Sequence, residues 1–335
     1  IGGRLQRLAD QQDWRPQVSV DTIEKHEAAA QPRRKRSREA LLGRSPQDTG
    51  AGWFNYVMLI FVIAVGIWPL YWAGVISTWR GEDKIFRDGA PQVIPDWSGQ
   101  GLKFNWEVIT GKISPPGYPA YASVDFIDSF RNSLIVVAIV VTATLFFCSL
   151  AGFAFAKLRF KGRDGLFYFV VLTLTIPAQL GIVGAYQIMD RLDWVGTLFA
   201  VTVPALVSAF GVFYMRQFIE DAIPDELIES ARVDGASTFR VYLSIVLPIV
   251  RPALGVLGLI TAVGAWNEYI WALVAVGNSD WQTIGPALHN LRAGSTPKTA
   301  IILTGAFLAS LPLLVLLAVA GRQIVRGIME GAVKT

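Results

Sequence analysis

Residues 133–156 read SLIVVAIVVTATLFFCSLAGFAFA and contain no charged side chain. A helix of roughly 20 apolar residues is long enough to cross the hydrocarbon core of a bilayer. Together with five similar stretches, this segment gives six expected spans: 53–78, 133–156, 166–189, 194–214, 252–276 and 299–320. The sequence shows no alternating pattern typical of a β-barrel, so helices are the only structure that can span. The chain is therefore predicted to be an all-α integral membrane protein with about six transmembrane helices.

The composition agrees with this class. Hydrophobic residues make up 53% of the chain and charged residues only 17%, whereas about a quarter of the residues in soluble domains are charged. The net charge of +4 does not by itself indicate nucleic-acid binding, because basic residues also accumulate on cytoplasmic loops. The single cysteine, Cys148, lies in an apolar run. It excludes an intrachain disulfide, and we expect it to be a buried apolar residue.

The distribution of lysine and arginine predicts the orientation. If residues 1–52 are cytoplasmic, the inside segments hold more than twice as many basic residues as the outside ones. The positive-inside rule then places both termini in the cytoplasm. The domain organisation follows: a cytoplasmic tail at 1–52 and a transmembrane domain at 53–335, with an external loop at 79–132 and a cytoplasmic loop at 216–251.

The tail contains the basic run PRRKRSR at 32–38. Such a run can bind nucleic acid or anionic lipid headgroups. Its position close to the first membrane helix favours membrane lipid, with no nucleic acid as a partner.

The segment 216–251 is too long for an ordinary connection between packed helices, and it is rich in acidic residues. Pro224 suits the start of a helix, and Gly235 suits its end or a tight corner. Ser237 can cap a second helix, and Pro248 marks the exit of that helix. An amphipathic pair of this kind can present a rigid surface to a partner protein, or it can simply brace the bundle.

The residues of this segment carry a resemblance. The run ESARVDG at 229–235, continued by IVLP at 245–248, resembles the EAA motif of binding-protein-dependent ABC importer permeases. The spacing matches throughout, and Ser230 in place of alanine is the one departure. The resemblance implies that this is the coupling-helix loop and that its motif residues couple the permease to an ATPase: Glu229, Ser230, Ala231, Asp234, Gly235, Ile245, Leu247 and Pro248.

Other stretches extend the resemblance over 53–335. FRNSL at 130–134 resembles the family's entry to its second helix, and WNE at 266–268 resembles the carbohydrate-uptake branch. The ending at 326–334 resembles the MalG-like subunit of maltose-type importers. The resemblance implies a bacterial plasma (inner) membrane location, a second permease subunit, two ATP-binding subunits and an extracytoplasmic solute-binding protein. The chain has no P-loop motif and no HExxH motif. We therefore expect no catalytic residue, metal or cofactor on this chain, with ATP and Mg²⁺ bound by the partner subunits.

Glu268 is the only charged residue inside the six expected spans. A carboxylate within a membrane is costly and often functional. On a continuous helix, Glu268 would share a face with Thr261, Gly264, Trp271 and Ala275, and Asn267 would lie beside it. Gly264, Asn267, Glu268 and Trp271 are therefore candidates for lining a solute pathway. A hydrogen bond between helices is the alternative role for Glu268.

The outside segment 277–298 contains Trp281 and His289, which are candidates for contacting the binding protein. An ordinary surface loop is the alternative. The expected function is a sugar-importer permease subunit, and a permease for glycerol phosphate or another small solute is the first alternative. A phosphate-bearing solute favours basic residues in the pathway, and the expected spans contain none. A secondary transporter would leave the acidic loop 216–251 without a role.

Overall fold

The computed structural model describes residues 53–80, 86–87, 90–116, 125–277, 279–292 and 298–332. The chain divides into two units, 1–67 and 68–335, which are considered separately. In the first unit the described residues 53–67 form the first part of helix α3 (Trp53–Ser77) and expose apolar side chains. The basic tail at 1–52 lies outside the described residues.

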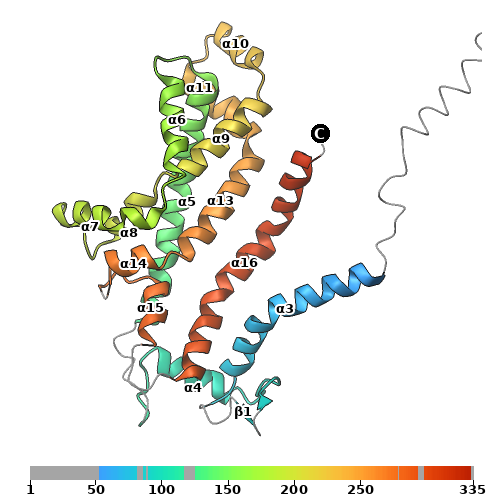
Figure 1. Cartoon of the computed structure of the whole chain (residues 1–335), viewed down its shortest axis with the longest axis vertical. Helices are drawn as coiled ribbons and strands as arrows, with labels where there is room; N and C mark the ends of the chain where they lie inside the picture. The colour runs from blue at the N-terminus through green and yellow to red at the C-terminus, as the bar shows by residue number, and fades with distance from the viewer. Residues whose placement is uncertain are drawn as a thin grey trace, which may run out of the picture. The chain divides into compact units, whose positions relative to one another are not determined.

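The described part of the second unit is almost entirely helical (Figure 1). Its elements before the coupling segment are the end of α3, the two-residue antiparallel strands β1 (Phe86–Arg87) and β2 (Ala90–Pro91), α4 (Gln100–Ile109), α5 (Phe126–Lys157), α6 (Arg163–Thr173), η3 (Ala178–Gly181), α7 (Ile182–Arg191), α8 (Leu198–Thr202), η4 (Val203–Ala205) and α9 (Ala209–Ala222). The remaining elements are α10 (Asp225–Val233), α11 (Thr238–Val241), the π-helix η5 (Tyr242–Val246), α12 (Leu247–Ile249), α13 (Arg251–Trp266), α14 (Ile270–Ala275), α15 (Ile284–Asn290) and α16 (Thr299–Ala332).

Helix lengths agree with a membrane protein. Among the described residues, four helices are long and apolar enough to cross a bilayer, and there are six if each of two bent helix pairs counts as one span. The fold class predicted from the sequence is thus confirmed, including the first, second and sixth spans, which correspond to α3, α5 and α16.

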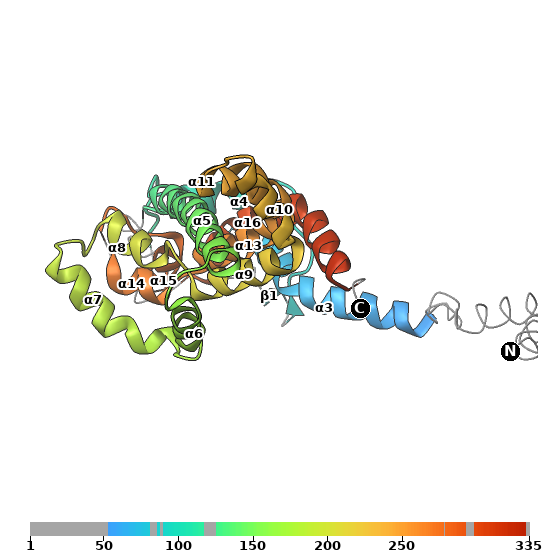
Figure 2. The ribbon, with the colours of Figure 1, turned by 90° about the horizontal axis from the view of Figure 1, so that it is seen from above.

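Two of the other spans are bent or broken, and the bend in the third span lies at Pro177, where a proline inside an apolar helix is expected to produce a kink. In the span expected at 166–189, α6 and the pair η3–α7 meet at 96°, on either side of Pro177 (Figure 2). Proline has no amide hydrogen to donate, so the helical hydrogen-bond ladder stops there. The span expected at 252–276 ends at Trp266 and resumes as α14, and α13 is bent by 79° from the preceding segment 238–249.

Helix α5 lies at the centre of the second unit and packs against α9, α13 and α15. Its contact with α9 is close because glycines stand at the crossing. A Cβ added at Gly152 would lie 2.7 Å from the Met215 Cβ and 2.8 Å from the Arg216 backbone nitrogen. The buried Cys148 lies at the same crossing, beside Gly211. Cys148 is thus the buried apolar residue that the sequence predicts.

Two apolar clusters hold opposite ends of the unit together. The cluster near α10 combines residues of α5, α9, α10, η5 and α13, with Phe153, Met215, Ile219, Tyr242 and Leu257 among its most buried members. The other, near α4 and α15, combines Ile109, Phe126, Trp266, Leu291 and Ile301. Each end of α5 therefore lies in a separate packed region.

Candidate functional site

The segment that carries the EAA-like motif, 216–251, includes the end of α9 at Ala222 and continues into α10. Ile223 is buried, and Pro224 stands at the N-cap position of α10. Asp225 and Glu226 occupy the first turn of α10, where negative charge complements the helix dipole. The amino end of α10 is thus specified by local sequence, as predicted.

A sharp corner follows α10. Gly235 has φ 77°, in the left-handed region, where a residue with a Cβ is strained. Its backbone N–H donates to the Arg232 carbonyl and that of Ala236 donates to the Ala231 carbonyl, each at 3.0 Å. Ser237 then caps α11, since its Oγ accepts from the Arg240 N–H at 3.4 Å. The predicted helix–glycine–helix arrangement is confirmed, and Pro248 lies one residue before the second helical run ends at Ile249, close to the predicted exit.

One face of α10 is buried against the body of the unit. Ile228 and Ala231 belong to the apolar cluster that also contains Tyr242 and Val246. The Tyr242 hydroxyl is hydrogen-bonded to Ser149 Oγ of α5 at 2.7 Å, in a buried position. The opposite face of α10 is open, and Val233 is 88% exposed.

The motif residues therefore fall into two groups. Ala231, Ile245 and Leu247 pack against the apolar cluster. Glu229, Ser230, Asp234, Gly235 and Pro248 are exposed. The motif extends over α10, the corner at Gly235, η5 and α12, with some of its residues packed inward and the others exposed.

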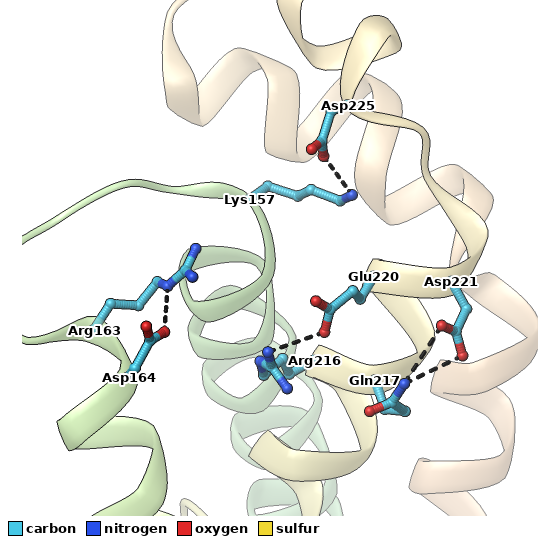
Figure 3. A network of polar contacts seen from close by, with 8 residues as sticks. All are labelled: Lys157, Arg163, Asp164, Arg216, Gln217, Glu220, Asp221 and Asp225. Atoms are coloured by element: carbon cyan, nitrogen blue, oxygen red, sulfur yellow. Dashed lines mark hydrogen bonds and ion pairs between the residues drawn. The ribbon is translucent and has the colours of Figure 1, made fainter.

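A polar groove of about 710 Å³ separates α10 from the turn between α5 and α6. Its charged lining side chains are Lys157, Arg159, Arg163, Glu220, Asp225, Glu229 and Arg232. Lys157 Nζ lies 2.6 Å from Asp225 Oδ1 (Figure 3). The hydrogen bond and positive charge of Lys157 lower the pKa of Asp225 below its ordinary value, and Arg159 adds to this effect. The sequence reasoning did not foresee this pair, because 68 positions separate the two residues.

The candidate pathway residues lie around the break between α13 and α14. Gly264, Asn267 and Glu268 are exposed, whereas Trp271 is partly buried. The continuous helical face predicted for Thr261, Gly264, Glu268, Trp271 and Ala275 is wrong, because α13 ends at Trp266 and α14 starts at Ile270.

Two tryptophans flank the break, of which Trp266 is buried and Trp271 is partly buried. Trp266 Nε1 donates to the Ala309 carbonyl of α16 at 3.1 Å, and Trp271 Nε1 donates to the Ala200 carbonyl of α8 at 2.9 Å. The Trp266 hydrogen bond joins α13 to α16, and the Trp271 hydrogen bond joins α14 to α8. Glu268 Oε1 accepts from the Trp271 N–H at 3.0 Å, so its carboxylate caps the first turn of α14.

The candidate binding-protein contacts lie in the segment before and within α15. Trp281 is partly buried and packs against a cluster containing Val136 and Val201. His289 is exposed, and its Nδ1 lies 2.9 Å from the Tyr269 hydroxyl. The structure thus leaves His289, but little of Trp281, open to a partner.

Comparison with known proteins places these features in a family. Residues 147–330, more than half of the chain, match the family "Binding-protein-dependent transport system inner membrane component". The chain is 31% identical over 205 residues to the arabinooligosaccharides transport system permease protein AraQ of Halalkalibacterium halodurans, covering 61% of this chain and 73% of the relative. It is 30% identical over 284 residues to the sn-glycerol-3-phosphate transport system permease protein UgpE of Escherichia coli, covering 83% and 95%.

A further relative is the lactose transport system permease protein LacG of Rhizobium radiobacter, 31% identical over 64% of this chain and 78% of its own. A solved bacterial ABC transporter involved in the import of the acidic polysaccharide alginate has the same fold. It matches with a TM-score of 0.65 at 20% identity, over 83% of this chain and 98% of the other. On the family match and these relatives, the chain belongs to the inner-membrane permeases of binding-protein-dependent ABC transport systems.

Proposed function

We propose that this chain is one of two permease subunits of an ABC importer for a sugar or sugar-derived solute, and that α10 receives the motion of an ATP-binding subunit. The observation that carries the proposal is the position of α10. Its buried face is continuous with the apolar cluster of α5, α9 and α13, and its outer face is open. A partner that moved α10 would therefore move the packed helices with it.

The proposed orientation places the α10 end and both termini in the cytoplasm. The basic turn next to α10 supports this, since Arg159 and Lys161 lie between α5 and α6 and Arg163 is the first residue of α6. Short loops of this kind carry the strongest weight in the positive-inside rule. The α15 end, with His289, then faces an extracytoplasmic binding protein.

The proposed division of labour places ATP and Mg²⁺ on two partner subunits. The groove beside α10 is lined by seven charged side chains together with five uncharged residues, and such a mixed surface is suited to protein contact. The purified chain without its partners is expected to show no ATP hydrolysis above background. Hydrolysis by a preparation proven free of ATPase subunits would contradict this assignment.

The relatives are named for two kinds of solute, carbohydrates and glycerol phosphate. Two of them are named for arabinooligosaccharides and lactose. Relatives named for sn-glycerol-3-phosphate cover 83% of this chain, against 61% and 64% for the two sugar-named relatives. Because of this greater coverage, glycerol phosphate is kept as a second candidate solute beside the carbohydrates.

The proposed solute pathway is lined by three exposed residues at the break between α13 and α14. Gly264 lies near the end of α13, and Asn267 and Glu268 lie in the break itself. Trp271 is next to them in α14, where its backbone N–H donates to Glu268 and its indole N–H donates to the Ala200 carbonyl. Hydroxyl-rich solutes suit such a mixture of amide, carboxylate and aromatic groups.

The solute is tested with the cognate binding protein. Calorimetric titration with arabino-oligosaccharides, lactose and glycerol phosphate should give heat for a carbohydrate, and uptake of that carbohydrate by the reconstituted complex should require ATP. Saturable binding of glycerol phosphate alone would select the second candidate. Uptake without ATP or without ATPase subunits would contradict importer function.

A further inference from the structure

The two ends of α5 are fastened to the two regions that face partners in the proposed importer. Helix α5 runs without a break from Phe126 to Lys157 and extends from the α15 end to the α10 end of the unit (Figure 1). A continuous helix is stiff along its axis, because every turn is hydrogen-bonded to the next. The contacts at its ends therefore decide what it can transmit.

At the α10 end the fastening is the ion pair between Lys157 and Asp225. Lys157 is the last residue of α5 and Asp225 the first of α10. The side chain of Lys157 is only 6% exposed, whereas that of Asp225 is 71% exposed. Among the described residues, Lys157 Nζ has no other acceptor than Asp225 Oδ1, at 2.6 Å. Loss of the carboxylate would leave a poorly hydrated ammonium without a partner, which is costly.

This pair differs from the other polar contacts around it. In Figure 3, Arg163 pairs with its neighbour Asp164, and the Arg216–Glu220 and Gln217–Asp221 pairs stay within α9. Such contacts within one helix stabilise that helix and join nothing else. Of the contacts drawn there, only Lys157–Asp225 links two different elements.

At the α15 end the fastening is Asn132. This buried amide donates from Nδ2 to the Asp280 carbonyl at 2.8 Å and to the Gln282 carbonyl at 3.1 Å. The adjacent Ser133 Oγ accepts from the Ile284 N–H at 2.8 Å, at the start of α15. The segment 280–284 is thus held to α5 by directed hydrogen bonds and leads directly into the helix that carries His289.

We propose that α5 is a transmission rod between α10 and the segment 280–290, with Lys157–Asp225 and Asn132 as the fastenings at its two ends. This inference rests on the proposed function, because it needs partners at both ends. Lys157, Asp225 and Asn132 act here as positioning residues and touch neither solute nor ATP. Through them, docking of a loaded binding protein at α15 shifts α5, and α5 shifts α10.

The experiment measures ATP hydrolysis by the complete reconstituted complex, with and without the solute-loaded binding protein, together with uptake. Asp225→Asn and Lys157→Met should each lower the stimulation by the binding protein about threefold, in keeping with the modest energy of one partly exposed ion pair. Lys157→Arg keeps the charge and should retain most of the stimulation. Asn132→Ala should lower it as well, and Ser133→Ala provides a milder variant if the first fails to assemble.

Asp221→Asn is the matched control, since Asp221 is an exposed acid whose contacts remain within α9. It should leave both stimulation and uptake unchanged. Both fastenings act on the same helix, α5. The double variant Asp225→Asn with Asn132→Ala should therefore lose little more stimulation of ATP hydrolysis than the more impaired single variant. Multiplying losses would mean that the two contacts act independently, which would overturn the proposal.

Unchanged stimulation in assembled Asp225→Asn and Asn132→Ala complexes would also overturn the proposal. Failure of the Asp225→Asn variant to assemble would overturn it too, because the ion pair would then serve assembly and not transmission. Gly235→Val distinguishes this inference from the proposed function. If Gly235→Val uncouples the complex while the α5 variants do not, only the rod is wrong. If none of them uncouples, the role of α10 itself is wrong.

Discussion

At the residue scale, the preference for glycine at position 235 comes from backbone geometry alone. An added Cβ would meet nothing within 4 Å, so crowding is not the constraint, and φ 77° is. Gly235→Val is expected to strain the corner by about 1–2 kcal/mol and to lower uptake per ATP hydrolysed. Gly235→Asn is the control, because asparagine tolerates left-handed conformations, and it should couple better than the valine variant. Equal, full coupling in both would contradict the proposed role of the corner.

Glu268 caps the first turn of α14 and lies exposed beside the candidate pathway. Glu268→Gln keeps an oxygen acceptor for the Trp271 N–H and should preserve stability. Glu268→Ala loses the cap and is expected to destabilise the complex by about 1 kcal/mol. Melting and uptake of both variants separate the roles: reduced uptake in stable Glu268→Gln complexes would indicate a pathway role, and normal uptake per assembled Glu268→Ala complex would exclude one.

The pKa of Asp225 is lowered from its ordinary value of 3.8, first by its hydrogen bond to Lys157. For a carboxyl whose pKa is lower in the folded state, the stabilisation is complete above the unfolded-state pKa. It is lost as the pH falls through the folded-state pKa. The ion pair is therefore expected to persist throughout the neutral range. The ratio of ATP hydrolysed to solute taken up should differ little between wild type at about pH 6 and about pH 8, and a steep dependence removed by Asp225→Asn would contradict this expectation.

At the element scale, the crossing of α5 and α9 depends on Gly152. The Cβ of an alanine there would meet the Met215 Cβ and the Arg216 backbone nitrogen at less than 3 Å. The gain in helix propensity is smaller than the cost of forcing two backbones apart, so Gly152→Ala should destabilise the complex by about 1–3 kcal/mol. Gly165→Ala in α6 meets nothing within 4 Å and serves as the control. A melting temperature unchanged by Gly152→Ala would show that the helices can separate without cost.

Two of the membrane-spanning helices are interrupted, one at Pro177 and one after Trp266. Proline removes a hydrogen bond at Pro177, and a sequence alone can indicate such a kink. The break after Trp266 has no comparable local signal, because neither Asn267 nor Tyr269 excludes a helix. On either side of the break, the indole N–H groups of Trp266 and Trp271 donate to carbonyls of two different helices, α16 and α8.

At the scale of the whole molecule, the proposed orientation makes a prediction about access. Cys148 is the only cysteine and is buried, so background labelling should be low. Val233→Cys and Arg292→Cys introduce exposed thiols at the α10 end and beside α15. A membrane-impermeant maleimide applied to intact cells should label Arg292→Cys, and Val233→Cys should react only after permeabilisation.

Cys148→Ala carrying neither new thiol controls for labelling of other proteins. The reverse pattern of labelling would place α10 outside the cell and would contradict the proposed docking of ATPase subunits there. Labelling of both sites in intact cells would show that the membrane does not separate the two ends.

The sequence determined the features that depend on neighbouring residues. Apolar length fixed the membrane class, and Pro224, Gly235 and Ser237 specified the helix–corner–helix of the coupling segment, because caps and turns are formed within a few residues. The motif around Glu229 indicated the family before any fold was known. The outcome for Pro248, which lies inside α12, shows that a proline marks a boundary only approximately.

The tertiary structure decided the features that join distant parts of the chain. Lys157 meets Asp225 across 68 positions, and Asn132 meets Asp280 across 148. These contacts depend on how far α5 extends and on how α9 and α15 pack beside it, which no local pattern records. The physical reason is that side-chain pairing between elements is set by the packing of their apolar faces, whereas sequence periodicity specifies each face and not its partner.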